Sequence, residues 1–152
     1  MRRQDREITD RAEMEAILSE VQVCRLALLD GSAPYIVPLC FAYADNTIWI
    51  HSAREGQKIE LIRKNPQCCV EVDISGGPVP DDRPCGWEFR YRSVICTGTA
   101  CIVEAYGEKK KGLSLILRHY GAGEHDFSLP ELDRVCVIRI AISSMTGKKF
   151  AY

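Results

Sequence analysis

The residues best suited to chemistry lie where an apolar strand runs directly into a helix. His51 and Ser52 end the apolar run, and Lys58 falls in the first turn of the expected helix. A lysine there is unfavourable, because the N-terminal end of a helix already carries partial positive charge. A bound anion would relieve this, since helix-start amides, a hydroxyl and a lysine together suit a phosphate. The segment predicts a phosphorylated ligand; the alternative is that Arg54 and Lys58 are solvated surface charges.

Two further segments carry candidate binding residues. Arg92 and Ser93, with Tyr91 before them, could serve a phosphate or could alternate outward on an ordinary strand. Trp87 could stack on a flat ring or anchor a core or an interface. The segment 34–38 has a proline at each end, which interrupts a strand ladder and frees backbone groups for a ligand such as a heterocycle edge. An ordinary edge strand is the alternative for that segment.

Several other chemistries are disfavoured. The sequence has no Walker A pattern, no G-x-G-x-x-G and no G-x-S-x-G, so it predicts neither those nucleotide sites nor a nucleophile elbow. The histidines at 51, 119 and 125 are too scattered for a metal site, and the eight cysteines form no C-x-x-C pair. Most cysteines lie in apolar runs, so we expect buried reduced thiols and no metal. Cys85 is the one expected to be exposed.

The composition fits one soluble domain over residues 1–152. The chain is 46% hydrophobic and 27% charged, which is typical of a globular protein. A net charge of −1 argues against nonspecific nucleic-acid binding, which needs a strongly basic face. A run of about 20 apolar residues is absent, so no membrane span is expected. The charged first residues lack a signal-peptide core, and we expect a cytoplasmic protein.

Hydrophobic periodicity and turn residues divide the chain into expected elements. Strands are expected over 24–29, 35–43, 47–52, 67–74, 88–103 and 134–143. Helices are expected over 10–20, 56–64 and 106–120, the first with Asp10 and Glu13 as a capping box. Gly98 is expected to mark a bend or bulge, and loops are expected over 75–86 and 121–130. Strands in hairpin order with inserted helices favour an antiparallel barrel; a βαβ unit over 47–74 is the secondary interpretation.

Taken in order, these segments resemble a known family. Arg25-Leu26-Ala27, PYIVPLCFAY, IWIHSAREGQKIELIRKNPQCCVEV and W-x3-YRSVICTGTA are similar to flavin-binding split-barrel proteins related to pyridoxine-phosphate oxidase. Within that superfamily the chain looks most like the Nim-type nitroimidazole-resistance proteins. The resemblance covers residues 10 to 148. It implies a mostly β fold with helices, a six-stranded antiparallel split β-barrel, and a homodimer with one FMN at each of two subunit interfaces.

The resemblance also implies roles for particular residues. Those implied to contact FMN are Val37, Pro38, His51, Ser52, Ala53, Lys58, Trp87, Tyr91, Arg92 and Ser93. Val37 and Pro38 would lie against the ring, Lys58 would bind the phosphate with Arg54 as a weaker candidate, and Trp87 and Tyr91 could come from the partner subunit. The tail Thr146-Gly147-Lys148 is similar to the family's ending and is expected to approach the cofactor.

The implied activity is FMN-dependent reduction of a small flat acceptor such as a 5-nitroimidazole, with an external electron donor and His51 as the catalytic residue. The alternatives are a flavin-binding or storage module without turnover, a haem-binding split-barrel protein, a plain structural dimer and a pyridoxine-phosphate oxidase. The pyridoxal-phosphate-binding tail of the true oxidase is not evident in this sequence.

Overall fold

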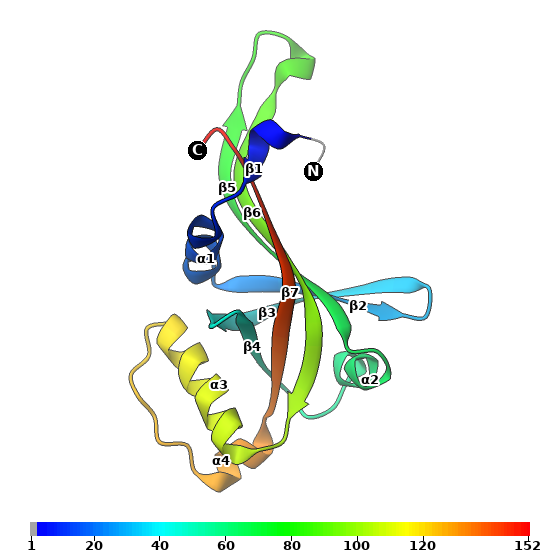
Figure 1. Cartoon of the computed structure of the whole chain (residues 1–152), viewed down its shortest axis with the longest axis vertical. Helices are drawn as coiled ribbons and strands as arrows, with labels where there is room; N and C mark the ends of the chain where they lie inside the picture. Colours follow the sequence, from blue (N-terminus) through cyan, green and yellow to red (C-terminus); the bar gives the residue numbers. More distant parts are fainter. Residues whose placement is uncertain (1–2) are drawn as a thin grey trace.

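The computed structural model describes residues 3–152 (Figure 1). Its strands are β1 (Glu7–Ile8), β2 (Val23–Asp30), β3 (Ala33–Ala44), β4 (Thr47–Ser52), β5 (Gln67–Val79), β6 (Glu88–Val103) and β7 (Cys136–Phe150). Its helices are α1 (Arg11–Glu20), α2 (Gln57–Lys64), α3 (Tyr106–His119) and α4 (Leu129–Arg134), with 3-10 turns η1 (Gln4–Arg6) and η2 (Pro84–Gly86).

Six antiparallel strands close into a ring. The strand order is β7-β4-β3-β2-β5-β6, and β6 pairs again with β7, while the short β1 adds to the far end of β7. This confirms the mostly β fold with a six-stranded antiparallel barrel. The βαβ interpretation is wrong, because β4 pairs with β3 and β7 and not with β5. The helix between β4 and β5 therefore connects strands on different parts of the ring.

Two hydrophobic clusters hold the ring and its helices together. Alternate residues of the strands fill the interior, where Leu26, Phe41 and Ile138 are fully buried. This period-2 burial follows from the alternation of side chains along a strand. A second cluster lies on the outside of β3 and β4, where Trp49 packs with residues of α3 such as Ile116. Helix α3 thus covers one part of the outer face only.

The ring is incomplete between β3 and β4. Strand β3 pairs with β2 from Ala33 to Cys40, but it pairs with β4 only from Phe41 to Ala44. Strand β4 continues along β7 as far as Ser52. The β2–β3 hairpin therefore projects away from the rest of the barrel, as Figure 1 shows at the right. The gap between the two strands is the split that the site described below occupies.

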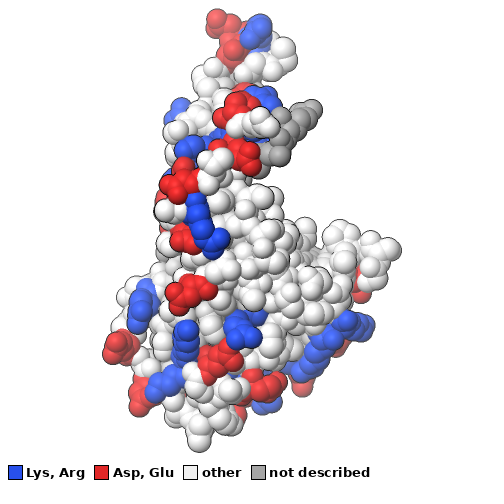
Figure 2. Space-filling view, viewed as in Figure 1, with Lys and Arg blue, Asp and Glu red and all other residues white. Residues whose placement is uncertain are grey.

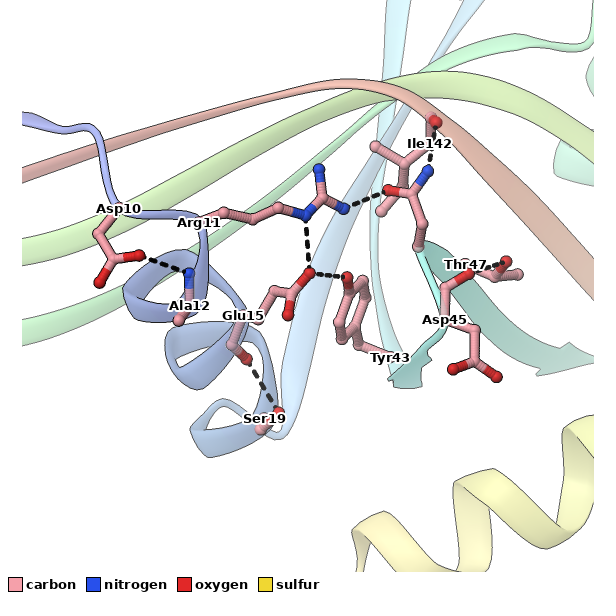
Figure 3. Close-up of polar contacts among 10 residues, drawn as sticks. Asp10, Arg11, Ala12, Glu15, Ser19, Tyr43, Asp45, Thr47 and Ile142 are labelled. Atoms are coloured by element: carbon pink, nitrogen blue, oxygen red, sulfur yellow. Dashed lines mark hydrogen bonds and ion pairs between the residues drawn. The ribbon is translucent and has the colours of Figure 1, made fainter.

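Polar contacts tie α1 to the end of β3 and, through the hydrogen bond from Arg11 to the Asn46 side chain, to the turn that follows it (Figure 3). The Tyr43 hydroxyl donates to Glu15 at 2.7 Å, and Arg11 forms an ion pair with the same carboxylate. These contacts lower the pKa of Glu15, with the Tyr43 hydrogen bond as the largest cause. Asp10 caps the helix by accepting from the Ala12 amide. Glu13 does not complete the expected capping box, because it forms an ion pair with Lys149 instead.

Two strands are longer than the sequence indicates. Strand β5 continues to Val79 and pairs with β6, so the expected loop over 75–86 is mostly a long hairpin with a register shift between Ser75 and Gly77. Strand β7 continues to Phe150, so the Thr146-Gly147-Lys148 segment lies within a strand rather than in a tail. In both extensions, backbone hydrogen bonds to the neighbouring strand outweigh the weak β propensity of glycine, proline and lysine. The expected bulge at Gly98 is confirmed by a register shift between Thr97 and Gly98.

One helix and the exposure of the cysteines depart from expectation. Helix α4 lies within the segment expected to be loop and strand, and Ser128 with Glu131 forms its capping box. All eight cysteines are free: Cys24, Cys68, Cys96 and Cys136 are buried and Cys69 is half-buried. Cys85 is exposed as expected, but Cys40 and Cys101 are exposed as well.

Charged side chains are unevenly spread over the surface. In the view of Figure 2 they gather beside α1 and the β5–β6 hairpin, around α3 and α4, and near α2 below the β2–β3 hairpin, whereas the middle of this face is largely uncharged. No helix within residues 3–152 is long and apolar enough to cross a membrane.

Candidate functional site

A buried hydroxyl without a partner marks the split between β3 and β4. Ser52 is the last residue of β4 and pairs in register with Cys136 of β7. Its Oγ atom is buried and has no hydrogen-bond partner within residues 3–152. Burying a polar group unpaired costs about 1–3 kcal/mol. A ligand oxygen or nitrogen beside Ser52 would remove that cost, so the hydroxyl fits a bound polar group.

The start of α2 offers donors beside Ser52 along the chain. Gly56 is the N-cap residue, with φ 123° and ψ 166°, a conformation that is essentially restricted to glycine. Among the described residues, no side chain caps this helix, and the amides of Ile59 and Glu60 already donate to the Gly56 carbonyl. The amides of Gln57 and Lys58 therefore point out of the helix start. Lys58 itself is half-buried, and its own amide is one of these free donors.

The open edge of β3 faces the same split. The Phe41 amide donates to the Tyr120 hydroxyl just past the end of β2, and that hydroxyl donates in turn to the Gln22 carbonyl. Amides of odd-numbered β3 residues therefore point towards β2, and those of even-numbered residues point to the open edge. Pro38 accordingly loses no ladder bond with β2, and its carbonyl is free. The Ile36 amide faces the open edge too.

This register refines the predicted ring contact. The backbone of Val37 belongs to the ladder with Leu26, and its side chain packs against the barrel core. The backbone groups available to a ligand are the Ile36 amide and the Pro38 carbonyl. Ile36 was not among the predicted site residues, although Pro34 and Pro38 on either side of it indicated a strand with free backbone groups.

His51 and Ser52 point to opposite faces of β4. Ser52 shares the face of Ile48 and Ile50, which line the barrel interior, whereas His51 shares the face of Trp49. His51 is exposed. A ligand that touches both side chains must therefore lie across the end of β4, where Ala53 is also exposed.

Other contacts fix the ends of this junction. Arg54 donates from its guanidinium to the Asp133 carbonyl at 2.8 Å, so it is turned towards α4. Gln57 donates to the Asp30 carboxylate at 2.9 Å, which links the start of α2 to the β2–β3 turn. These two contacts hold the junction between α4 on one side and the projecting hairpin on the other.

The remaining predicted residues lie at the other end of the barrel. Arg92 pairs in register with Lys149 of β7, whereas Ser52 pairs with Cys136. At ~3.3 Å per residue, these two positions are about 40 Å apart along β7. The Arg92 guanidinium contacts the Glu20 carboxylate and lies 4.6 Å from the centre of the Tyr152 ring.

The neighbours of Arg92 share its location. Ser93 pairs with Lys148, and the Lys148 ammonium lies 5.9 Å from the centre of the Tyr91 ring. Trp87 is 57% exposed beside the tip of the β5–β6 hairpin. His51, Ser52, Ala53 and Lys58 lie together at the junction of β4 and α2, whereas Val37 and Pro38 lie on the part of β3 that does not pair with β4. One chain does not bring Trp87, Tyr91, Arg92 and Ser93, or the segment 146–148, to that junction.

Comparison with known proteins agrees with this architecture. A family model described as pyridoxamine 5'-phosphate oxidase matches residues 10–149. The chain therefore belongs to the pyridoxamine 5'-phosphate oxidase family of flavin-binding split-barrel proteins.

Individual relatives are similar over different shares of their length. The crystal structure of a candidate 5-nitroimidazole antibiotic resistance protein from Bacteroides thetaiotaomicron is 31% identical, with a TM-score of 0.82, over 93% of this chain and 85% of that one. A FAD-binding protein from Mesorhizobium loti is 26% identical, with a TM-score of 0.72, over 96% and 98%. An uncharacterized protein from Rhizobium meliloti is 31% identical over 65 residues, which span 43% of this chain and 42% of that relative.

The Ser52 hydroxyl gives the first testable prediction. In flavin-free protein, Ser52→Ala should raise the free energy of unfolding by about 1 kcal/mol, because it removes a buried hydroxyl that has no partner. The matched control is Ser143→Ala, since the Ser143 hydroxyl donates to the Thr97 carbonyl at 3.0 Å. This change should not raise the free energy of unfolding. Urea denaturation measures both. Equal losses in the two variants would contradict the assignment.

Proposed function

We propose that this protein binds FMN at the split between β3 and β4 and reduces small flat acceptors such as 5-nitroimidazoles. The observation that carries the proposal is the buried, unpartnered Ser52 hydroxyl beside the uncapped start of α2. Membership of a flavin-binding family supports a flavin as the occupant. The phosphate-like character of the donors supports a flavin nucleotide rather than riboflavin.

The available groups fit the two ends of such a molecule. Lys58 and the amides at the start of α2 would hold the phosphate. The Ile36 amide and the Pro38 carbonyl would bond the polar edge of the ring, and Ser52 would bond a group between them. When bound, a flavin supplies electron transfer between a donor and an acceptor, while the protein supplies binding and orientation. The donor would be an external reductant such as a reduced nicotinamide.

The acceptor class rests on one relative and one side chain. The Bacteroides thetaiotaomicron protein described as a 5-nitroimidazole resistance candidate is 31% identical over most of both chains. His51 is exposed at the end of β4, where it can donate a hydrogen bond or a proton to an acceptor oxygen. FAD is the second candidate cofactor, because the 26% identical Mesorhizobium loti protein is described as FAD-binding.

A second copy of the chain would complete the site. The outer face of β2, β3, β5 and β6 presents Ile36, Ala27, Cys69 and Thr97 in register as an uncharged row across all four strands. Ile36 is 62% exposed and Ile95, in the next row, is 44% exposed. An uncharged row that contains an exposed isoleucine supports an interface; the Arg25–Glu71 ion pair lies in the next row, beside Ile95. In a homodimer built on this face, Trp87, Tyr91, Arg92 and Ser93 of the partner would reach the split.

The absorbance spectrum of the purified protein tests the cofactor, and identification of the released chromophore separates FMN from FAD. Lys58→Gln should weaken FMN binding roughly 10- to 100-fold, because it removes a charge-assisted bond to phosphate. Riboflavin binding should not change, since riboflavin has no phosphate. Lys64→Gln, at the opposite end of α2, is the matched control and should bind FMN normally. Fluorescence titration gives the affinities; unchanged FMN affinity in Lys58→Gln would refute the phosphate assignment, and a Soret band would instead indicate haem.

His51 is tested by activity at full cofactor occupancy. His51→Ala should slow reduction of a 5-nitroimidazole by about 100-fold if it donates a proton to the acceptor, while FMN content stays at the wild-type level. His125→Ala, which alters an exposed histidine paired with Glu131, serves as the control. Single-turnover absorbance measurements separate this step from flavin reduction. A wild-type rate in flavin-loaded His51→Ala would show that His51 is not catalytic, and no turnover by the wild type would favour a binding or storage module.

The dimer is tested at its predicted face. Ile36→Lys should produce a monomer, because it replaces the most exposed apolar side chain of the uncharged row with a charge. Lys110→Glu, on the exposed side of α3, is a control that should leave the assembly unchanged. Light scattering coupled to size exclusion measures the mass of each variant. A wild-type monomer, or a dimer that Ile36→Lys does not affect, would rule out this interface.

A further inference from the structure

A small cavity lies on the other side of the β4–β7 pair from the β3 edge. Its volume is about 40 Å³, and its lining includes Arg54, Arg63, Lys109 and Cys136. About 15 Å³ suffices for one water molecule, so the cavity accepts a small group of a few heavy atoms. Its residues come from the end of α2, the start of α3 and the neighbouring ends of β6 and β7.

The cations around this cavity lack carboxylate partners. Within residues 3–152, Arg54, Arg63 and Lys109 take part in no ion pair. Arg54 donates to the Asp133 carbonyl, and Lys109 has the Leu132 carbonyl as an acceptor at 3.4 Å, a long and neutral contact. The lining contains one acid, Glu104, which is exposed. Three cations against one carboxylate leave the cavity positively charged.

Lys109 is the decisive residue, because it is only 7% exposed. Burying an ammonium group is costly unless a negative charge compensates it. Its other neighbour is the Tyr106 ring, with the ammonium 5.9 Å from the ring centre, which compensates only weakly at that distance. The lysine is thus held inside the protein without a charge partner of its own.

The thiol of Cys136, which also lines the cavity, is affected by the same positive charges. Burial raises the pKa of Cys136, and this is the largest effect on it. Lys109, Arg63 and Lys58 act in the opposite direction, whereas Glu104 adds to the rise. The cations of the cavity and the lysine at the start of α2 therefore act on one place in the structure.

We infer that this cavity is an oxyanion-binding site, with Lys109, Arg63 and Arg54 as its ligands for a phosphate or carboxylate group. The anion removes the uncompensated charge on Lys109, and the two guanidinium groups bind its oxygens with planar donor geometry. Two sources supply the same chemistry: a phosphate group of a bound flavin nucleotide, or a free oxyanion held next to the flavin site. The inference stands on the cavity itself and does not require that a flavin binds.

Inorganic phosphate and flavins distinguish these sources. The full chain is stripped of flavin, and its thermal unfolding is followed with phosphate against sodium chloride of equal ionic strength. Phosphate at about 100 times its Kd should raise Tm by about 8 °C. Lys109→Gln should weaken phosphate binding at least about tenfold. Arg63→Gln should weaken phosphate binding as well, and because Arg63 is exposed this variant should fold even if Lys109→Gln does not. The control Lys110→Gln should bind phosphate normally.

The flavin-loaded protein provides the second arm. If the cavity holds a flavin phosphate, loading abolishes the phosphate effect, and Arg63→Gln weakens FMN or FAD binding without changing riboflavin binding. If the cavity holds a free oxyanion, phosphate still stabilises the loaded protein and Arg63→Gln leaves flavin affinity unchanged. Absence of phosphate stabilisation in the stripped protein, together with unchanged FMN, FAD and riboflavin affinities in both variants, would overturn the inference. Failure to bind any flavin would refute the proposed function alone.

Discussion

The separation of β3 from β4 after Phe41 is the constraint on which the rest of the structure depends. Strand β4 has six residues that pair with β7, but only four of its residues pair with β3. The ring therefore closes through β7, and the first part of β3 keeps one unpaired edge. Unpaired strand edges are ordinarily protected against association with other chains. Here the two prolines remove donors from that edge, so that few backbone groups remain available to a ligand.

The same constraint determines where positive charge accumulates. Because β4 ends on β7 and the chain then enters α2 directly, the start of α2 lies next to the end of the split. Glycine at position 56 permits the sharp change of direction, and it leaves the helix without a side-chain cap. Arg54, Lys58, Arg63 and Lys109 all lie around this junction, and within residues 3–152 none of them forms an ion pair, although Glu55, Glu60 and Glu104 lie nearby. A region with free backbone donors and cations without ion-pair partners is suited to anionic ligands.

Much of this fold could be predicted from the sequence where local signals agree with tertiary packing. The turn at Asp45-Asn46 forms where expected, with both residues at positive φ, and α2 ends before Pro66 because proline blocks its continuation. The extensions of β5 and β7 could not be predicted, since their glycine, proline and lysine residues form strands only because neighbouring strands supply ladder bonds. The same limit applies to Ile36, whose free amide depends on strand register rather than on residue type.

The predicted site residues divide for a physical reason. Residues contiguous in sequence, such as His51, Ser52 and Lys58, stay together in any fold that joins a strand to a helix. Arg92 and Ser93 were grouped with them by chemistry, but the register of β7 separates the two sets by most of the strand's length. A ligand that used both would have to contact two copies of the chain. If the uncharged row on the outer face is an interface, residues that are far apart within one chain, such as Ser52 and Arg92, lie close together between two copies of the chain.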